Sequence, residues 1–190
     1  MAIEKTIWPG STQLGPSPVV LVGTGDGKRH PWDIMTAAWA GTLCSDPPMI
    51  SIGVRPSRFT YHQIETLKCF TVNMPTVDQV ETVDYCGVIS GKDTDKFSTR
   101  HLTPIAASKI TAPIVEECPL ALECEVKHRL ELGTHVVYIG QVVAVQVTST
   151  LIDEKGKLDL KKANLLAYAH GHYYSLGEEL GYYGYSVRKK

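Results

Sequence analysis

The segment from residue 33 to residue 60 contains the side chains best suited to chemistry. In its first half, Thr36-Ala37-Ala38-Trp39 places small residues around one indole, which lets a flat ligand lie close to the backbone. Its second half ends in Arg55-Pro56-Ser57-Arg58-Phe59-Thr60, with two guanidinium and two hydroxyl groups where we expect a helix to begin. The N-terminus of a helix favours an anion. Together the two halves predict a site for a nucleotide-like cofactor.

Turn residues and hydrophobic alternation predict a mainly β chain around this segment. Strands connected mostly by hairpin-length loops, with few helices, are typical of an antiparallel barrel with helical additions. No repeat or linker divides the sequence, so we expect a single domain over residues 1–190. The expected strands are 18–22, 34–43, 49–54, 69–74, 120–131 and 135–148, and the expected helices are 57–67, 75–90 and 161–168.

Two local features refine this expectation. Ser57 is the expected cap of its helix, and Thr76 and Gln79 have the spacing of a capping box. The glycine-rich stretch 23–27 is interpreted as a hairpin turn, because no helix follows it. A Rossmann sheet is disfavoured, since G-x-G-x-x-G and regular strand–helix alternation are both missing.

The faces of the expected strands indicate what each strand contacts. Ser51 and Gly53 leave one face of strand 49–54 small, which suits a ligand. Strand 120–131 alternates regularly, so we expect one buried and one solvated face, with His128 in the core. Strand 135–148 is apolar on both faces and is expected to be covered on both sides.

Composition excludes several classes of protein. The net charge of −1 offers no general field for nucleic acid, and no apolar run approaches the roughly 18 residues of a membrane span. The N-terminus lacks the features of a signal peptide, and the five cysteines include no Cys-x-x-Cys pair, so we expect a cytoplasmic protein with reduced thiols. His170 and His172 have no other clustered ligand, so no metal site is expected.

An ordered set of motifs carries a family resemblance. Over roughly residues 15–180 the chain resembles the flavin reductase-like proteins of the FMN-binding split-barrel fold, and within them the flavoredoxins. That resemblance implies an antiparallel, Greek-key-like barrel with a few peripheral helices. The motifs are M-T-A-A-W-A-G-T (35–42), P-P-M-I-S-I-G-V (47–54), R-P-S-R-F-T (55–60), F-T-V-N-M-P (70–75), D-K-F (95–97), P-L-A-L-E-C-E-V (119–126) and G-T-H-V-V-Y-I-G-Q-V (133–142).

The resemblance also implies roles for particular residues in holding FMN without a covalent bond. Lys96 matches a lysine that faces the flavin, where a cation stabilises the reduced, anionic ring; a solvated loop lysine is the alternative. His135 is the catalytic candidate, able to donate to the flavin edge or relay a proton, and a structural histidine is the alternative. The further candidates are Thr36, Ala37, Ala38, Trp39, Ser51 and Tyr168 beside the ring, and Ser57, Arg58 and Thr60 around the phosphate.

Three positions leave alternatives open. Asp33 stands where many relatives carry Asn; it could accept a hydrogen bond from a ribityl hydroxyl, but its carboxylate would repel a phosphate. Arg55 could point to solvent. Arg58 could be an ordinary solvated side chain beside a helix cap.

The resemblance implies an FMN-dependent oxidoreductase. Either NAD(P)H reduces the flavin, or FMN stays bound and relays electrons between protein partners. A homodimer is expected, with the flavin near the interface between its chains. The alternative is a flavin-binding module without turnover, used for storage or sensing.

Overall fold

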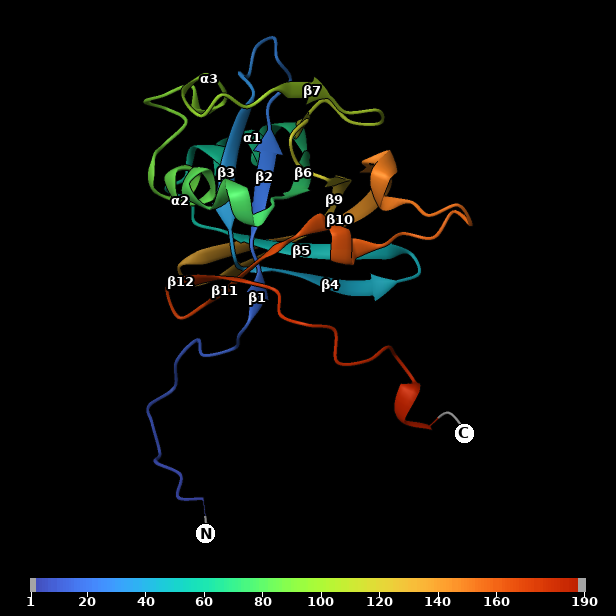
Figure 1. Cartoon of the computed structure of the whole chain (residues 1–190). Coiled ribbons are helices and arrows are strands. Elements are labelled where there is room, and N and C mark those ends of the chain that lie inside the picture. Colours follow the sequence, from blue (N-terminus) through green and yellow to red (C-terminus); the bar gives the residue numbers. More distant parts are fainter. Residues whose placement is uncertain (1–2, 188–190) are drawn as a thin grey trace.

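A computed structural model describes residues 3–187 of the chain. Its main element is a seven-stranded sheet in which every neighbouring pair is antiparallel. Figure 1 shows its strands crossing in the middle of the molecule. In spatial order the strands are β3 (Asp33–Ala37), β2 (Val20–Thr24), β6 (Cys69–Met74), β9 (Leu120–Leu132), β10 (His135–Val147), β5 (Pro48–Val54) and β4 (Ala40–Ser45).

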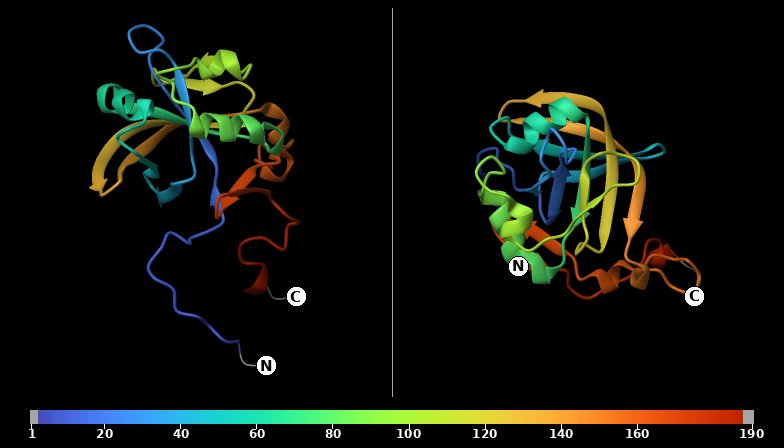
Figure 2. Two further views of the ribbon diagram at one scale, coloured as in Figure 1. Left: turned by 90° about the vertical axis from the view of Figure 1, so that its left-hand side faces the viewer. Right: turned by 90° about the horizontal axis from the view of Figure 1, so that it is seen from above.

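The order of the strands forces this sheet to curl. β3 and β4 form its two edges, although they follow each other directly in the chain. Only Ala38 and Trp39 join them, and the three residue steps from Ala37 to Ala40 span at most about 11 Å. The edges are therefore drawn together into the barrel seen from above in Figure 2. Among the described strands, β3 and β4 do not pair with each other, so the barrel is split at this point.

The expected single strand over residues 34–43 is therefore wrong. The chain leaves one edge at Ala37 and enters the other at Ala40, and a continuous strand could not make that crossing. Gly53 of β5 donates its backbone N–H to the carbonyl of Trp39 at 2.7 Å, which fixes the crossing. The interpretation of residues 23–27 as a hairpin turn is confirmed, since Thr24 pairs with Asp33.

Two small sheets complete the β structure. β1 (Ser17–Pro18), β11 (Leu166–Ala169) and β12 (His172–Ser175) form one, and β7 (Pro104–Ala106) with β8 (Pro113–Val115) forms the other. The expected helix over residues 161–168 is wrong. A short 3₁₀ turn (Leu160–Ala163) ends at Asn164, whose φ of +48° turns the chain into β11, where pairing on both sides holds it extended.

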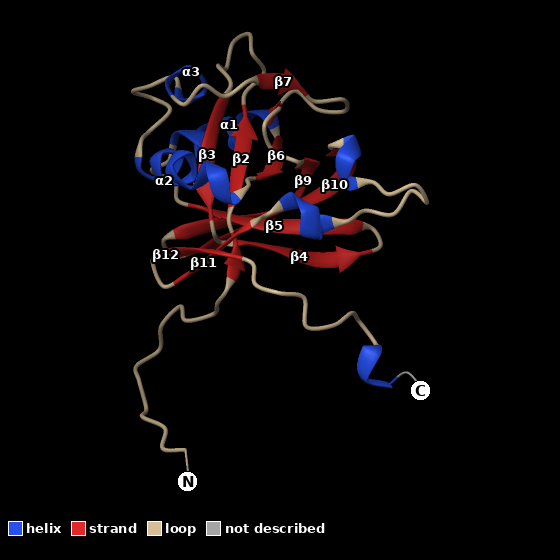
Figure 3. Ribbon diagram, viewed as in Figure 1, coloured by secondary structure: helices blue, strands red, loops and turns tan. Residues whose placement is uncertain are grey.

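Helices cover one end of the barrel, as Figure 3 shows. They are α1 (Phe59–Leu67), α2 (Val80–Val88) and α3 (Lys96–Thr99), with 3₁₀ turns at Val77–Gln79, Ser149–Leu151 and Tyr185–Val187. The capping box of Thr76 and Gln79 is confirmed. Ser57 is not the cap of α1, because Arg58 holds that position without a side-chain bond. Within residues 3–187 no helix is long and apolar enough to cross a membrane.

Successive side chains of β2 point to opposite faces of the sheet and pack into two different hydrophobic cores. Val20 and Val22 of β2 pack inside the barrel, in a cluster with Phe70 and Tyr138. Leu21, which lies between them in the chain, packs outward in a second cluster that includes residues of α2 and α3. β2 is therefore buried on both faces, because the helices cover the outside of the sheet next to the split.

The expectations for the two longest strands need correction. β6 pairs with β9 only as far as Glu125, so within residues 3–187 the outer half of β9 pairs with no strand but β10. His128 is consequently exposed instead of buried in the core, while Glu123, on the face expected to be solvated, is buried. β10 is only partly covered on its second face, where Val145 is exposed.

Candidate functional site

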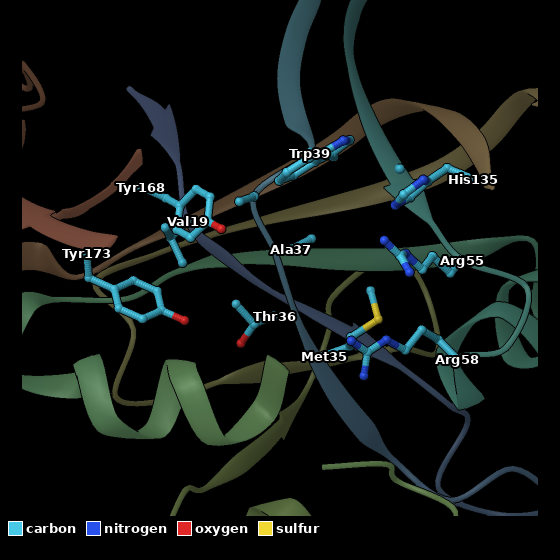
Figure 4. Close-up of a pocket in the computed structure, with 12 residues that line it drawn as sticks. Val19, Met35, Thr36, Ala37, Trp39, Arg55, Arg58, His135, Tyr168 and Tyr173 are labelled. Atoms are coloured by element: carbon cyan, nitrogen blue, oxygen red, sulfur yellow. The ribbon is translucent and has the colours of Figure 1, made fainter. Parts of the chain in front are cut away.

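A cavity of about 380 Å³ opens where the barrel is split; we call it the split cavity. This volume lies within the roughly 300–1,000 Å³ typical of sites for small molecules and cofactors. Figure 4 shows its lining, which includes residues of β3, the crossing, β5, the turn before α1, β10, β11 and β12. Of the residues singled out in the sequence, it is lined by Thr36, Ala37, Ala38, Trp39, Arg58, His135 and Tyr168.

The two ends of the split cavity differ in chemistry. Arg55 and Arg58 lie at one end in Figure 4, and Tyr168 and Tyr173 lie at the other. Both guanidiniums come from the turn that leads into α1, so the partial positive charge of the helix N-terminus adds to theirs. The cavity can therefore hold an anionic group at one end and a planar apolar group at the other.

Trp39 is fixed on several sides. Its ring lies parallel to the imidazole of His135 within 6°, at a centroid distance of 6.2 Å, and is tilted against Tyr168 at 6.3 Å. A Cβ at position 53 would lie 3.1 Å from the Cβ of Trp39, closer than ordinary packing allows. Gly53 therefore lets β5 approach the crossing closely without displacing Trp39.

His135 begins β10 and faces the split cavity. Partial burial and the positive charge of Arg55 lower the pKa of its imidazole. Its Nδ1 lies 2.9 Å from the hydroxyl of Thr134. The imidazole is thus neutral at neutral pH and can accept a proton or a hydrogen bond from a ligand in the cavity.

Thr36 presents mainly its backbone to the split cavity. Its hydroxyl donates to the carbonyl of Val83 in α2 at 2.5 Å, which ties β3 to that helix. Ala37 is buried, and Ala38 follows it into the crossing. The short side chains of Ala37 and Ala38 leave the backbone accessible, as a flat ligand requires.

Asp33 and Lys96 lie outside the lining of the split cavity, where they form a buried ion pair. Lys96 Nζ is 3.0 Å from Asp33 Oδ1, and the two side chains are only 2% and 4% exposed. Thr60 donates its hydroxyl to Asp33 Oδ2 at 3.3 Å. Burial raises the pKa of Asp33, against the opposing effect of the Lys96 ammonium. This cluster joins β3, α1 and α3 behind the cavity.

Two more residues singled out in the sequence lie outside this lining. Ser51 donates its hydroxyl to the carbonyl of Gly41 at 3.4 Å, on the outer part of the sheet. Ser57 is exposed in the turn between Arg55 and Arg58. The roles of Ser51, Ser57, Thr60, Lys96 and Asp33 toward a cofactor stay predictions.

The split cavity also has lining residues that the sequence did not reveal. Val19, Met35 and Tyr173 line it. So do Gly53, from the small strand face noted in the sequence, and Arg55, left open above. Tyr173 pairs with Tyr168 across the β11–β12 hairpin and donates its hydroxyl to Asp84 at 3.0 Å. If that hairpin had been recognised in the sequence, Tyr173 would have been a candidate site residue together with Tyr168.

Fold and site together define an antiparallel split barrel with an arginine- and aromatic-lined cavity at the split. Residues 13–177 match the family model described as "Flavin reductase like domain". The chain therefore belongs to the flavin reductase-like family, and the fold inferred from its motifs is confirmed. Membership places it among flavin-related oxidoreductases.

Solved structures with similar folds include three informative ones. Flavoredoxin of Desulfovibrio vulgaris (Miyazaki F) is 34% identical, with a TM-score of 0.90 over 97% of this chain and 100% of its own. An FMN-binding protein from Thermus thermophilus is 26% identical, with a TM-score of 0.77 over 96% and 98%. A putative flavin reductase with a split barrel domain, from Shewanella frigidimarina, is 25% identical, with a TM-score of 0.80 over 90% and 87%.

Replacing Lys96 by Met tests the buried ion pair. The change leaves the carboxylate of Asp33 buried without a cation, so we expect the free energy of unfolding to fall by about 3–5 kcal/mol. Urea denaturation measures this loss. Lys127→Met is the matched control, since Lys127 pairs with Glu125 at 2.9 Å on the surface and its loss should cost less than about 1 kcal/mol. Equal losses in both variants would contradict the role given to the pair.

Proposed function

We propose that this protein is an oxidoreductase that holds one FMN in the split cavity without a covalent bond. The observation that carries this proposal is the pairing, within one cavity, of two guanidinium groups at one end with aromatic rings at the other. FMN has the matching halves, a phosphate dianion and a planar ring system. Family membership supports the same cofactor, as does the similar FMN-binding protein from Thermus thermophilus.

The residues present fit each half of FMN. Arg58, with Arg55 beside it, would hold the phosphate at the N-terminus of α1. Ser57 lies in the same turn and could add its hydroxyl. Thr60 is nearly fully buried and already donates to Asp33, so its contribution is to position α1.

The ring system would lie along the crossing between β3 and β4. Trp39 and Tyr168 would bound it, and the short side chains of Ala37 and Ala38 would let it reach backbone groups. The redox chemistry belongs to the bound flavin, which accepts and passes on electrons. The chain positions the ring, shields it from water and supplies the neutral imidazole of His135 to hold or move a proton at the ring edge.

The electron source is NAD(P)H or a redox protein. Within the described lining of the split cavity, the cations Arg55 and Arg58 are both assigned to the phosphate of FMN. A nicotinamide dinucleotide would then have to bind with its own phosphates outside the cavity. A redox protein needs no such phosphate site. Electron transfer between FMN and a protein partner is therefore the second form that we propose for the activity.

The visible spectrum of the purified protein, followed by anaerobic titration with NADH and NADPH, tests this proposal. We expect a yellow protein, or one that becomes yellow with added FMN, and bleaching of the flavin by a donor. Bleaching at catalytic rates indicates a reductase. No bleaching by either nucleotide indicates an electron carrier or a storage or sensing module. A colourless protein that takes up no FMN would overturn the proposal.

We also propose that the chain forms a homodimer. Both terminal segments leave the barrel on the same side in Figure 1, and both carry large, exposed apolar side chains. Ile7 is 97% exposed, Trp8 72% and Leu180 90%. Several large apolar side chains exposed on both segments support an interaction site, and a second copy of the chain offers the matching apolar segments.

Sedimentation equilibrium tests the dimer. We expect a mass of twice the 20.9 kDa of one chain, and a shift toward that single-chain mass when Ile7 and Trp8 are both changed to Ser. A control with Lys5→Ser, in the same segment, should leave the dimer intact. A wild-type protein that sediments as a single chain at micromolar concentration would contradict the proposal.

Its compartment is proposed to be the cytoplasm. All five cysteines are free, and four of them are buried. Burial raises the pKa of Cys86 to about 11 and of Cys118 to about 12, so these thiols stay protonated and unreactive. Such thiols behave as packing residues in a reducing environment.

A further inference from the structure

A second cavity, of about 450 Å³, lies against the split cavity. The two share Ala38, Trp39 and Tyr168, so this residue group forms the wall between them. We call it the N-terminal cavity, because its opposite side is formed by residues 12–15 and 17 of the N-terminal segment. We propose that it binds a small, planar, uncharged ligand, such as an aromatic or conjugated carbonyl compound.

The lining of the N-terminal cavity disfavours a charged ligand. Within the described residues no Lys, Arg, Asp or Glu lines it, whereas two arginines line the split cavity. Moving an ion out of water without an opposite charge costs several kcal/mol. A carboxylate or phosphate ligand therefore has its site on the other side of the wall, and the N-terminal cavity is left for neutral molecules.

The side chains that line the N-terminal cavity favour a flat ligand. Ala38, Ala40 and Ala169 contribute only methyl groups, and the rings of Trp39 and Tyr168 meet at an angle of 56° along one side. Such rings present flat apolar surface on which a planar molecule packs well.

Of the polar side chains that line the N-terminal cavity, which include Thr12 and Gln13, that of His170 is placed to orient the ligand. His170 lines the N-terminal cavity from the two-residue turn between β11 and β12. His170 and Gly171 have φ values of +53° and +80°, as in a type I′ turn, for which Asn-Gly is the preferred sequence. The imidazole makes no side-chain hydrogen bond with the described residues, so it can donate one to a ligand carbonyl.

This inference goes beyond the FMN proposal, because neither arginine nor His135 lines the N-terminal cavity. A ligand bound there would be separated from a ring in the split cavity by the wall of Ala38, Trp39 and Tyr168. Its binding does not require the flavin, so the two proposals can fail separately.

Isothermal titration calorimetry with acetophenone and benzoate tests the inference. The two probes are similar in size and planar, and only benzoate is charged. We expect acetophenone to bind at one site per chain, and to be weakened at least about tenfold by Ala169→Leu, which fills the N-terminal cavity. Ser175→Leu is the matched control on β12, because Ser175 is exposed and lines neither cavity. Benzoate binding should not respond to Ala169→Leu.

A second variant, His170→Asn, keeps a residue suited to the turn and removes the imidazole. We expect weaker acetophenone binding with an unchanged melting temperature. Acetophenone that does not bind, or that binds equally well to wild type and Ala169→Leu, would overturn the inference. So would benzoate that competes with acetophenone for the same site. Repeating the titration with FMN present separates the proposals, because failure of FMN to bind while acetophenone still binds contradicts only the flavin site.

Discussion

The two-residue connection between β3 and β4 is the constraint on which the rest of the structure depends. Because the two edges of the sheet are consecutive in the chain, Ala38 and Trp39 must bridge them, and the sheet closes around its core as a result. The same connection keeps the edges from pairing, so an opening remains beside it. Trp39 stands in that opening as part of the wall between the two cavities. The same two-residue connection therefore closes the barrel and creates the opening in which the site lies.

The buried pair of Asp33 and Lys96 supports this arrangement from the far end of β3. Its members lie 3.0 Å apart, and a Cβ at position 91 would come within 2.2 Å of the carboxylate, so Gly91 lets the chain pass close to it. Thr60 brings α1 to the same carboxylate. The strand that leads into the crossing and the helix that presents Arg58 are therefore positioned by one charged cluster outside the split cavity.

Much of this was predictable from the sequence, and the failures have physical reasons. Turn residues and alternation predicted the antiparallel barrel, and the small residues around Trp39 predicted a ligand site, whose cavity they line. Local pattern could not show that residues 34–43 divide between opposite edges, because sheet order is a long-range property. Residues 161–168 became a strand through pairing with partners distant in sequence. Lys96 was recognised as a candidate, yet its pairing with Asp33 depends on how α3 packs, which no spacing reveals.

The central claim is that the arginine end of the split cavity holds the phosphate of FMN. The ratio of the dissociation constants of riboflavin and FMN tests it most directly, because the two molecules share the ring and differ by the phosphate. A charge-assisted contact contributes about 1.5–3 kcal/mol, so wild type should prefer FMN by roughly ten- to hundredfold. Arg58→Ala should reduce that preference and leave riboflavin affinity unchanged. An equal preference for FMN in wild type and Arg58→Ala would contradict the account.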